Sequence, residues 1–183
     1  MKKILCILMA IAMFVSLTAC GSKTAAEQKL IIDAVKAEIQ SEDFAGWQEL
    51  YKDFTGEEPA VPQVTDVTRY QIPDFDGVKM DCYLVTVSGS FAHWYNEAEQ
   101  QGAINETMFI FVDAASKKSY DSISTDAASV SHDTTTELGR ATYLMWIHGE
   151  IATGSYSGSY LNDSETVTTL SADDLKFIND NLK

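Results

Sequence analysis

The sequence has few of the residues that hold metals, form disulfides or bind nucleic acid. Its 183 residues include three cysteines and three histidines, and 13 Lys and Arg stand against 27 Asp and Glu. A nucleic-acid-binding surface needs an excess of basic side chains, so this balance argues against that class of partner. The formal net charge of −14 also disfavours electrostatic adhesion to anionic lipid headgroups. We interpret the charge mainly as a solubility feature.

Several enzyme motifs are also missing from the sequence. None of His93, His132 and His148 lies in an H-E-x-x-H motif, and no cysteine pair is spaced to hold zinc. There is no P-loop and no dinucleotide-binding fingerprint. The segment 154–158 has the glycine frame of a nucleophile elbow, but Tyr156 stands in the place of the serine. We therefore assign no catalytic residue, no metal site and no non-covalent cofactor.

The histidines offer one weak metal candidate. His93 and Glu97 are four residues apart and would share a face of a helix, but two ligands are too few for a metal site. We predict that His93 is an exposed side chain. His148 has apolar neighbours and is expected to be partly buried and hydrogen-bonded.

The N-terminal residues have the pattern of a secretory signal peptide. Lys2 and Lys3 precede an apolar run from Ile4 to Val15, which is shorter than the roughly 20 residues of a membrane span. The motif Leu17-Thr18-Ala19-Cys20 follows. It resembles the lipobox of bacterial lipoproteins. The resemblance implies that Cys20 becomes the first residue of the mature chain and carries a thioether-linked diacylglycerol.

This interpretation divides the chain into three parts. Residues 1–19 are the signal peptide, residues 20–26 are the lipidated cysteine with a short tether, and residues 27–183 form one α+β domain. We expect the mature protein to be extracytoplasmic and anchored to a bacterial membrane through the lipid on Cys20. A tether of this length reaches roughly 20 Å, so the domain lies close to the bilayer. Cys82 is then without a disulfide partner, and we predict that it is buried and inert.

Two helices are predicted at the start of the domain, although they could also be one. Ile31, Val35 and Ile39 recur at helical spacing, Ser41 is suited to cap a second helix, and Gly56 to end it. The second helix carries an aromatic stripe formed by Phe44, Trp47, Tyr51 and Phe54. Aromatic residues at this spacing usually form core, so we assign the stripe no ligand.

A hairpin is predicted next. The segments Gln63–Ile72 and Val78–Ser88 are strand-like, and the Pro-Asp-Phe-Asp-Gly sequence between them is typical of a turn. In the second strand Cys82 alternates with Asp81 and Tyr83, which places the cysteine on the core face. Three carboxylates lie near the turn: Asp74, Asp76 and Asp81. The EF-hand pattern is absent, so we predict a turn rather than a calcium site.

The middle of the chain completes the predicted sheet. Phe91, Trp94 and Ala98 have helical spacing and predict a short helix or a wide loop over 91–98. Thr107–Val112 is apolar and suits a central strand, and Ser119–Ser124 suits an edge strand. Four consecutive strands with short connections favour an antiparallel meander.

The last third of the chain is predicted to contain two more helices. The helix over 138–151 is apolar on so much of its circumference that we expect it to be buried by more than one neighbour. Glu165–Thr169 suits a last strand. The closing helix has Ser171 as its cap and Asp174 at its third position. Its apolar stripe is formed by Leu175, Ile178 and Leu182.

The segment 153–164 provides the candidate ligand-binding residues. It is rich in glycine and serine, and little apolar periodicity requires its tyrosines Tyr156 and Tyr160 to be buried. Tyrosine is favoured on recognition surfaces because few rotors are frozen on binding. These rings would stack on a sugar or pack against a protein partner. The alternative is that they lie against the preceding helix as part of the core.

The fold class that follows is α+β, with N-terminal helices, a four-stranded antiparallel meander, a buried helix and a C-terminal helix. This order is similar to that of cystatin-like and NTF2-like folds, by analogy only. The predicted function is that of a membrane-anchored binding or interaction module with an unknown protein or glycan ligand. The alternative is a cell-envelope hydrolase whose site is assembled only in space.

Overall fold

A computed structural model describes residues 25–75, 78–121 and 166–183. Four predictions lie outside these residues: the signal and Cys20, the helix over 138–151, the remaining histidines His132 and His148, and the tyrosines Tyr156 and Tyr160. Within the described residues, no helix is both long and apolar enough to cross a membrane.

The described chain opens with two separate helices. The first runs over 25–39, and α2 spans Glu42–Thr55. Ser41 separates them because its hydroxyl accepts a hydrogen bond from the Phe44 amide, which caps α2. Gly56 ends α2 in the left-handed conformation, with φ 72°, and its amide donates to the Lys52 carbonyl. Both predicted signals are confirmed.

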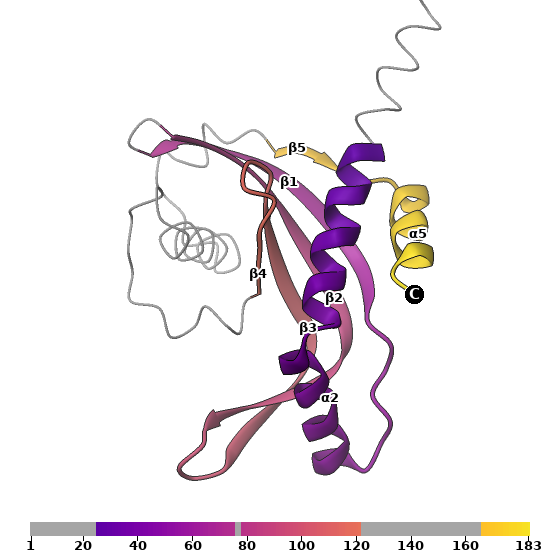
Figure 1. Ribbon diagram of the computed structural model, residues 1–183, viewed down its shortest axis with the longest axis vertical. Coiled ribbons are helices and arrows are strands. Elements are labelled where there is room, and N and C mark those ends of the chain that lie inside the picture. Colours follow the sequence, from indigo (N-terminus) through magenta and orange to yellow (C-terminus); the bar gives the residue numbers. More distant parts are fainter. Residues whose placement is uncertain (1–24, 76–77, 122–165) are drawn as a thin grey trace, which may run out of the picture.

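Within the described part of the chain, the sheet has five antiparallel strands in the order β4-β3-β2-β1-β5 (Figure 1). The strands are β1 (Gln63–Phe75), β2 (Val78–Asn96), β3 (Gln101–Asp113), β4 (Ser119–Asp121) and β5 (Thr166–Thr169). The first four form the predicted meander, and β5 pairs with the outer edge of β1. The α+β class is therefore confirmed.

The prediction of a helix or wide loop over 91–98 is wrong. Strand β2 continues to Asn96 and pairs with β3 through Trp94 and Gly102. Phe, Trp and Tyr favour extended backbone, and here this preference overrides the helical spacing. The last pair between β1 and β2 at this end is Gln63 with Ser88, so residues 91–105 form a two-stranded extension of the sheet, named here the arm.

The helices cover one face of the sheet and enclose the core (Figure 1). Fully buried side chains come from the first helix, from α2 and from strands β2 and β3, and include Ile31, Val35, Phe44, Phe91, Val85 and Ile110. Helix α5 (Ala172–Asn181) closes the core with Ile178 and Leu182. It is fixed by the side chain of Asn179, which bonds both the amide (2.8 Å) and the carbonyl (2.9 Å) of Val64.

The predicted capping of α5 is confirmed. The Ser171 hydroxyl accepts from the Asp174 amide, and the Asp174 carboxylate accepts from the Ser171 amide. The same carboxylate accepts a 2.8 Å hydrogen bond from Gln28 of the first helix. The Ser171 hydroxyl donates a 2.6 Å hydrogen bond to the Asp174 carboxylate, and this bond, helped by those from the Ser171 amide and Gln28, lowers the pKa of Asp174. One capping box thus also joins the two ends of the described chain.

Strand β2 faces the hydrophobic core with the side opposite to the predicted one. Cys82 is buried, as expected. Tyr83 was expected on the solvent face, but it is only 4% exposed and packs in the core with Val85 and Val87. Residues 83, 85 and 87 form the face of β2 that enters the hydrophobic core, whereas Cys82 is buried outside this core, so the prediction that the Cys82 face is the core face is wrong.

Candidate functional site

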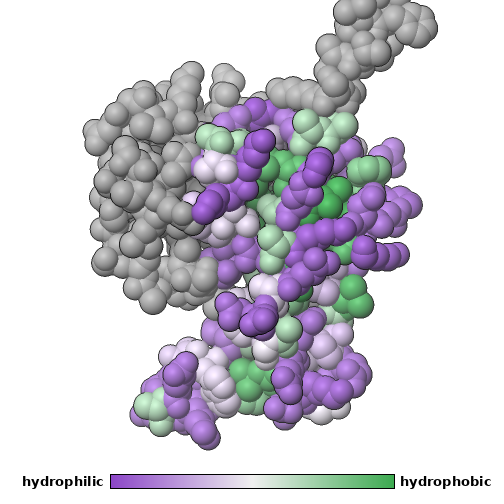
Figure 2. All heavy atoms as spheres, viewed as in Figure 1, coloured by the Kyte–Doolittle hydropathy of each residue, from purple (hydrophilic) through white to green (hydrophobic). Residues whose placement is uncertain are grey.

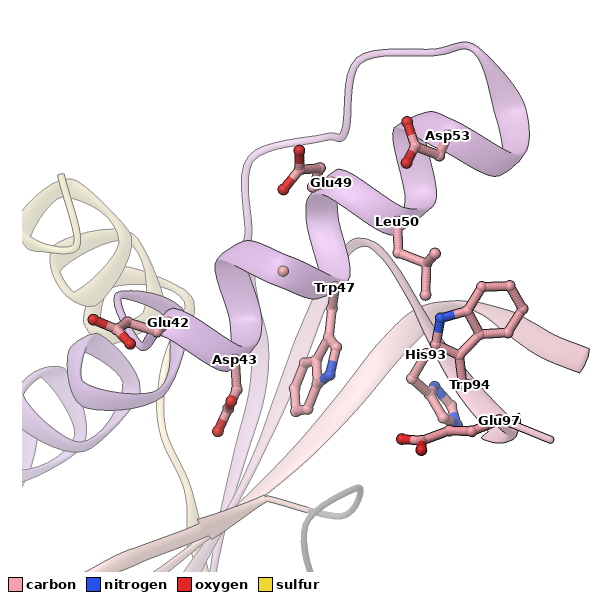
Figure 3. A pocket seen from close by; sticks show the side chains of 10 residues that line it. Glu42, Asp43, Trp47, Glu49, Leu50, Asp53, His93, Trp94 and Glu97 are labelled. Carbon is pink, nitrogen blue, oxygen red and sulfur yellow. The ribbon is translucent and has the colours of Figure 1, made fainter. Parts of the chain in front are cut away.

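A cleft of about 490 Å³ lies where α2 crosses the base of the arm (Figure 3). One wall is α2 and the other is the end of β2 with the turn that follows. Its lining residues are Glu42, Asp43, Gly46, Trp47, Glu49, Leu50, Asp53, His93, Trp94 and Glu97. On the face shown in Figure 2, the end of the molecule formed by α2 and the arm carries mainly hydrophilic side chains with a few apolar ones between them.

Two tryptophans supply the aromatic surface of the cleft. Trp47 is partly buried, and its ring packs against Phe44 and Phe91 with centroid distances of 6.0 and 6.5 Å. Trp94 comes from β2 and is 37% exposed. Leu50 points towards Trp94 from α2 (Figure 3). Trp47 is therefore packed against the core, whereas Trp94 projects from the arm.

Five carboxylates surround these rings: Glu42, Asp43, Glu49, Asp53 and Glu97. All five are exposed, and in the described part of the chain none has its carboxylate in an ion pair or a side-chain hydrogen bond. No Lys or Arg lines the cleft. The lysine of α2, Lys52, forms its ion pair with Glu58 instead. The cleft is thus a concave acidic surface with aromatic walls.

Helix geometry explains why α2 concentrates this charge. Glu42, Glu49 and Asp53 are spaced by seven and four residues, so they lie along one side of the helix. Phe44 is the first residue of the aromatic stripe on the adjacent side of α2, and it is buried in the core. The prediction that the aromatic stripe is core holds for Phe44, but Phe54 is 39% exposed and Trp47 lines the cleft. The acidic side of the helix was the signal that sequence reasoning missed.

His93 and Glu97 do meet, although no helix joins them. His93 lies on β2 and Glu97 in the turn after it, and both line the cleft. His93 is partly buried rather than exposed, and its Nδ1 lies 3.1 Å from the side-chain nitrogen of Asn105 on β3. In the described residues, no group of three or more His, Cys, Asp or Glu side chains is placed to hold a metal ion.

A second cavity, of about 550 Å³, lies beside the first helix and has a different chemistry. Arg69 of β1 bonds Asp81 of β2 through two nitrogens, at 2.9 and 2.5 Å. Its third nitrogen bonds Glu27 of the first helix at 2.8 Å, and its guanidinium lies 5.7 Å from the ring centroid of Tyr83. We name these four residues the Arg69 cluster.

The four side chains of the Arg69 cluster are joined to one another by hydrogen bonds. The Tyr83 hydroxyl donates a 3.0 Å hydrogen bond to the Glu27 carboxylate that Arg69 also contacts. Hydrogen bonding to Asp81 raises the pKa of Arg69 above its ordinary value. Burial, reinforced by Glu27, raises the pKa of Tyr83. The cluster joins the first helix to β1 and β2. Asp81 is one of the three carboxylates near the predicted turn, and it forms an ion pair with Arg69.

Comparisons with known proteins supply no relative for this chain. Neither the protein-family models nor the curated proteins nor the solved structures contain a significant match. The chemistry of the cleft therefore has to be argued from its own residues.

Proposed function

We propose that this chain is a lipid-anchored, extracytoplasmic binding module that binds an organic cation in the cleft between α2 and the arm. The observation that carries the proposal is the combination of two tryptophan side chains with five carboxylates that have no described cationic partner.

The charge of the cleft selects the sign of the ligand. Carboxylates held near one another repel, and a bound cation would relieve this repulsion. The same carboxylates would repel an anionic ligand. A neutral sugar would gain stacking on the indoles but nothing from the charges.

The tryptophans favour an organic cation over a simple metal ion. An ammonium group near the face of an indole gains about 0.5–2 kcal/mol, and the methylene groups attached to it pack on the rest of the ring. Trp47 and Trp94 come from different elements, so a ligand between them would contact both walls of the cleft. Acidic residues extend along α2 from Glu42 to Asp53, which suits an elongated ligand with more than one amine.

The position of the cleft is compatible with membrane anchoring. The described chain begins at residue 25, at one end of the first helix, and α2 with the arm lies at the opposite end of the molecule (Figure 1). If Cys20 carries the anchor, the cleft would face away from the bilayer. The ligand would then arrive from the aqueous side.

The test uses the full-length chain purified in mild detergent and titrated with spermidine, a linear triamine. Indole fluorescence and calorimetry would report binding, with N-acetylglucosamine as the neutral probe and malate as the anionic one. We expect saturable binding of spermidine alone. The triple variant Glu49→Gln/Asp53→Asn/Glu97→Gln should weaken it at least tenfold, which corresponds to about 1.4 kcal/mol.

A matched control separates the site from the overall charge. Glu57→Gln/Glu106→Gln/Asp173→Asn removes the same number of exposed carboxylates outside the cleft. This variant should bind spermidine within about twofold of wild type, because none of its three positions lines the cleft. Equal weakening by both variants would refute the cleft as the site, as would tighter binding of the sugar than of spermidine.

The anchor is tested separately with radiolabelled palmitate in the bacterial host. Wild type should be labelled and membrane-bound, and Cys20→Ala should be neither labelled nor cleaved at that position. A labelled Cys20→Ala variant would contradict the lipoprotein hypothesis. The hydrolase alternative stays a prediction, and release of soluble fragments from peptidoglycan by wild type but not by His93→Ala would favour it.

A further inference from the structure

Gly102 on the arm faces the aromatic ring of Phe54 on α2. A Cβ atom at this glycine would lie 2.6 Å from Cε2 and 2.8 Å from Cζ of Phe54, and 3.1 Å from the carbonyl oxygen of His93. Carbon atoms in van der Waals contact lie about 3.5–4.0 Å apart, so the ring occupies space that any other residue would need for its side chain. The absence of a side chain at position 102 is what allows α2 to approach the arm here.

The same phenylalanine supports a wall of the cleft. The ring of Phe54 contacts the Trp94 indole edge to face, with a centroid distance of 4.9 Å and an interplanar angle of 81°. Trp94 is also the register partner of Gly102 across the arm. Phe54 thus lies against both residues of one cross-strand pair. It is not itself a lining residue of the cleft, whereas Trp94 is.

We propose that Gly102 and Phe54 are positioning residues that set the orientation of Trp94, and through it the affinity of the cleft. The importance of this contact for affinity rests on the cation-binding function proposed above. A Cβ at position 102 displaces the Phe54 ring by about an ångström, because it would lie 2.6 Å from a ring carbon where carbon atoms in contact need about 3.5 Å or more. Trp94 is more than a third exposed, and among the described residues its ring contacts the ring of Phe54. The wall that faces the ligand then changes shape while all the lining residues remain.

The experiment compares Gly102→Ala, Phe54→Ala and the double variant in the full-length chain. The first readout is the indole Nε1–H resonance of Trp94, assigned with Trp94→Phe, which requires no ligand. The second is the dissociation constant for spermidine. We expect Gly102→Ala to shift the resonance and weaken binding about fivefold to tenfold, and Phe54→Ala to do the same. Because both act through one ring, the double variant should bind no more weakly than Phe54→Ala.

Gly89→Ala, on the neighbouring strand β2, is the matched control. A Cβ at this glycine would lie 3.5 Å from Cα of Pro62, which is ordinary contact, so it should change neither readout. An unchanged Trp94 resonance in Gly102→Ala would overturn the proposal, and so would additive losses of affinity in the double variant. If wild type fails to bind spermidine, the proposed function falls. The resonance shift alone then decides whether Gly102 and Phe54 orient Trp94.

Discussion

The Arg69 cluster and the cleft use the same kinds of residue in opposite ways. In the cluster, the carboxylates of Glu27 and Asp81 share one guanidinium, and an aromatic ring covers it. In the cleft, five carboxylates surround two aromatic rings, and no described cation lies among them. The cluster is mostly buried, since the Arg69 side chain is 13% exposed, whereas the carboxylates of the cleft are all exposed.

This difference indicates what each region contributes. Removing charges from water costs free energy that only a well-formed set of partners offsets, so the cluster has to be complete in the folded protein. Exposed carboxylates stay hydrated and can remain unpaired at a small cost in repulsion. The cluster therefore belongs to the stability of the fold, and the cleft retains its capacity for a partner from outside. Three substitutions test this contrast.

Arg69→Met should have the largest effect on stability. It leaves Glu27 and Asp81 partly buried without their cation, and breaking such a pair costs about 3 kcal/mol. Urea unfolding followed by circular dichroism would measure the loss. Lys29→Met is the matched control, because its ion pair with Asp33 is exposed and should contribute under about 0.5 kcal/mol. Equal losses of unfolding free energy in the two variants would contradict the view that the buried Arg69 cluster stabilises the fold more than an exposed ion pair does.

The sequence predicted the local parts of this fold well. Caps at Ser41 and Ser171 and the stop at Gly56 depend on a few adjacent residues, and all three are confirmed. The arm was missed because Phe91, Trp94 and Ala98 have helical spacing, and the strand that pairs with Phe91–Asn96 lies beyond the next turn. The burial of Tyr83 was missed because it depends on the helices that cover the sheet, which alternation within one strand does not record.

The candidate site was harder to predict than the fold. Trp47 and Trp94 are 47 positions apart in the sequence, and only the crossing of α2 over the arm brings them to one cleft. His93 and Glu97 were singled out together, but for a helix that does not form. The acidic side of α2 was readable from the spacing of its residues. Nothing in the sequence indicated that this side would face an aromatic wall rather than open solvent.

Glu38 is intermediate between the paired carboxylates of the Arg69 cluster and the unpaired ones of the cleft, because its partner is a hydroxyl rather than a cation. Its carboxylate accepts a 2.7 Å hydrogen bond from Ser119 of β4, and burial raises its pKa, with a smaller contribution from Asp121. A carboxyl whose pKa is raised on folding destabilises the protein above that pKa, and this penalty disappears as the pH falls towards the ordinary value of 4.5. Glu38→Gln keeps an acceptor for Ser119 and removes the charge.

We therefore expect Glu38→Gln to be more stable than wild type at pH 7 and equal to it near pH 4. Thermal unfolding across this range would measure the difference. Glu106→Gln, an exposed site on β3, is the control and should show no such pH dependence. An advantage that grows as the pH falls would show that the hydrogen bond from Ser119 outweighs the burial of the charge.

Asp53→Asn should have the smallest effect and the opposite sign to that of Arg69→Met. Asp53 is four residues after Glu49 on α2, a like-charge pair that costs a helix about 0.2–0.5 kcal/mol. It also lies in the last turn of α2, where the helix dipole disfavours a negative charge. Replacing this carboxylate with an amide should therefore stabilise the protein by a few tenths of a kcal/mol at low salt. The gain should shrink as added salt screens exposed charges, and chemical unfolding at two ionic strengths would measure it.

The same change at Asp81, in the Arg69 cluster, should destabilise the protein because it removes the anionic partner of a buried guanidinium. If Asp53→Asn also destabilises the protein, this carboxylate has a structural partner and is not held for a ligand.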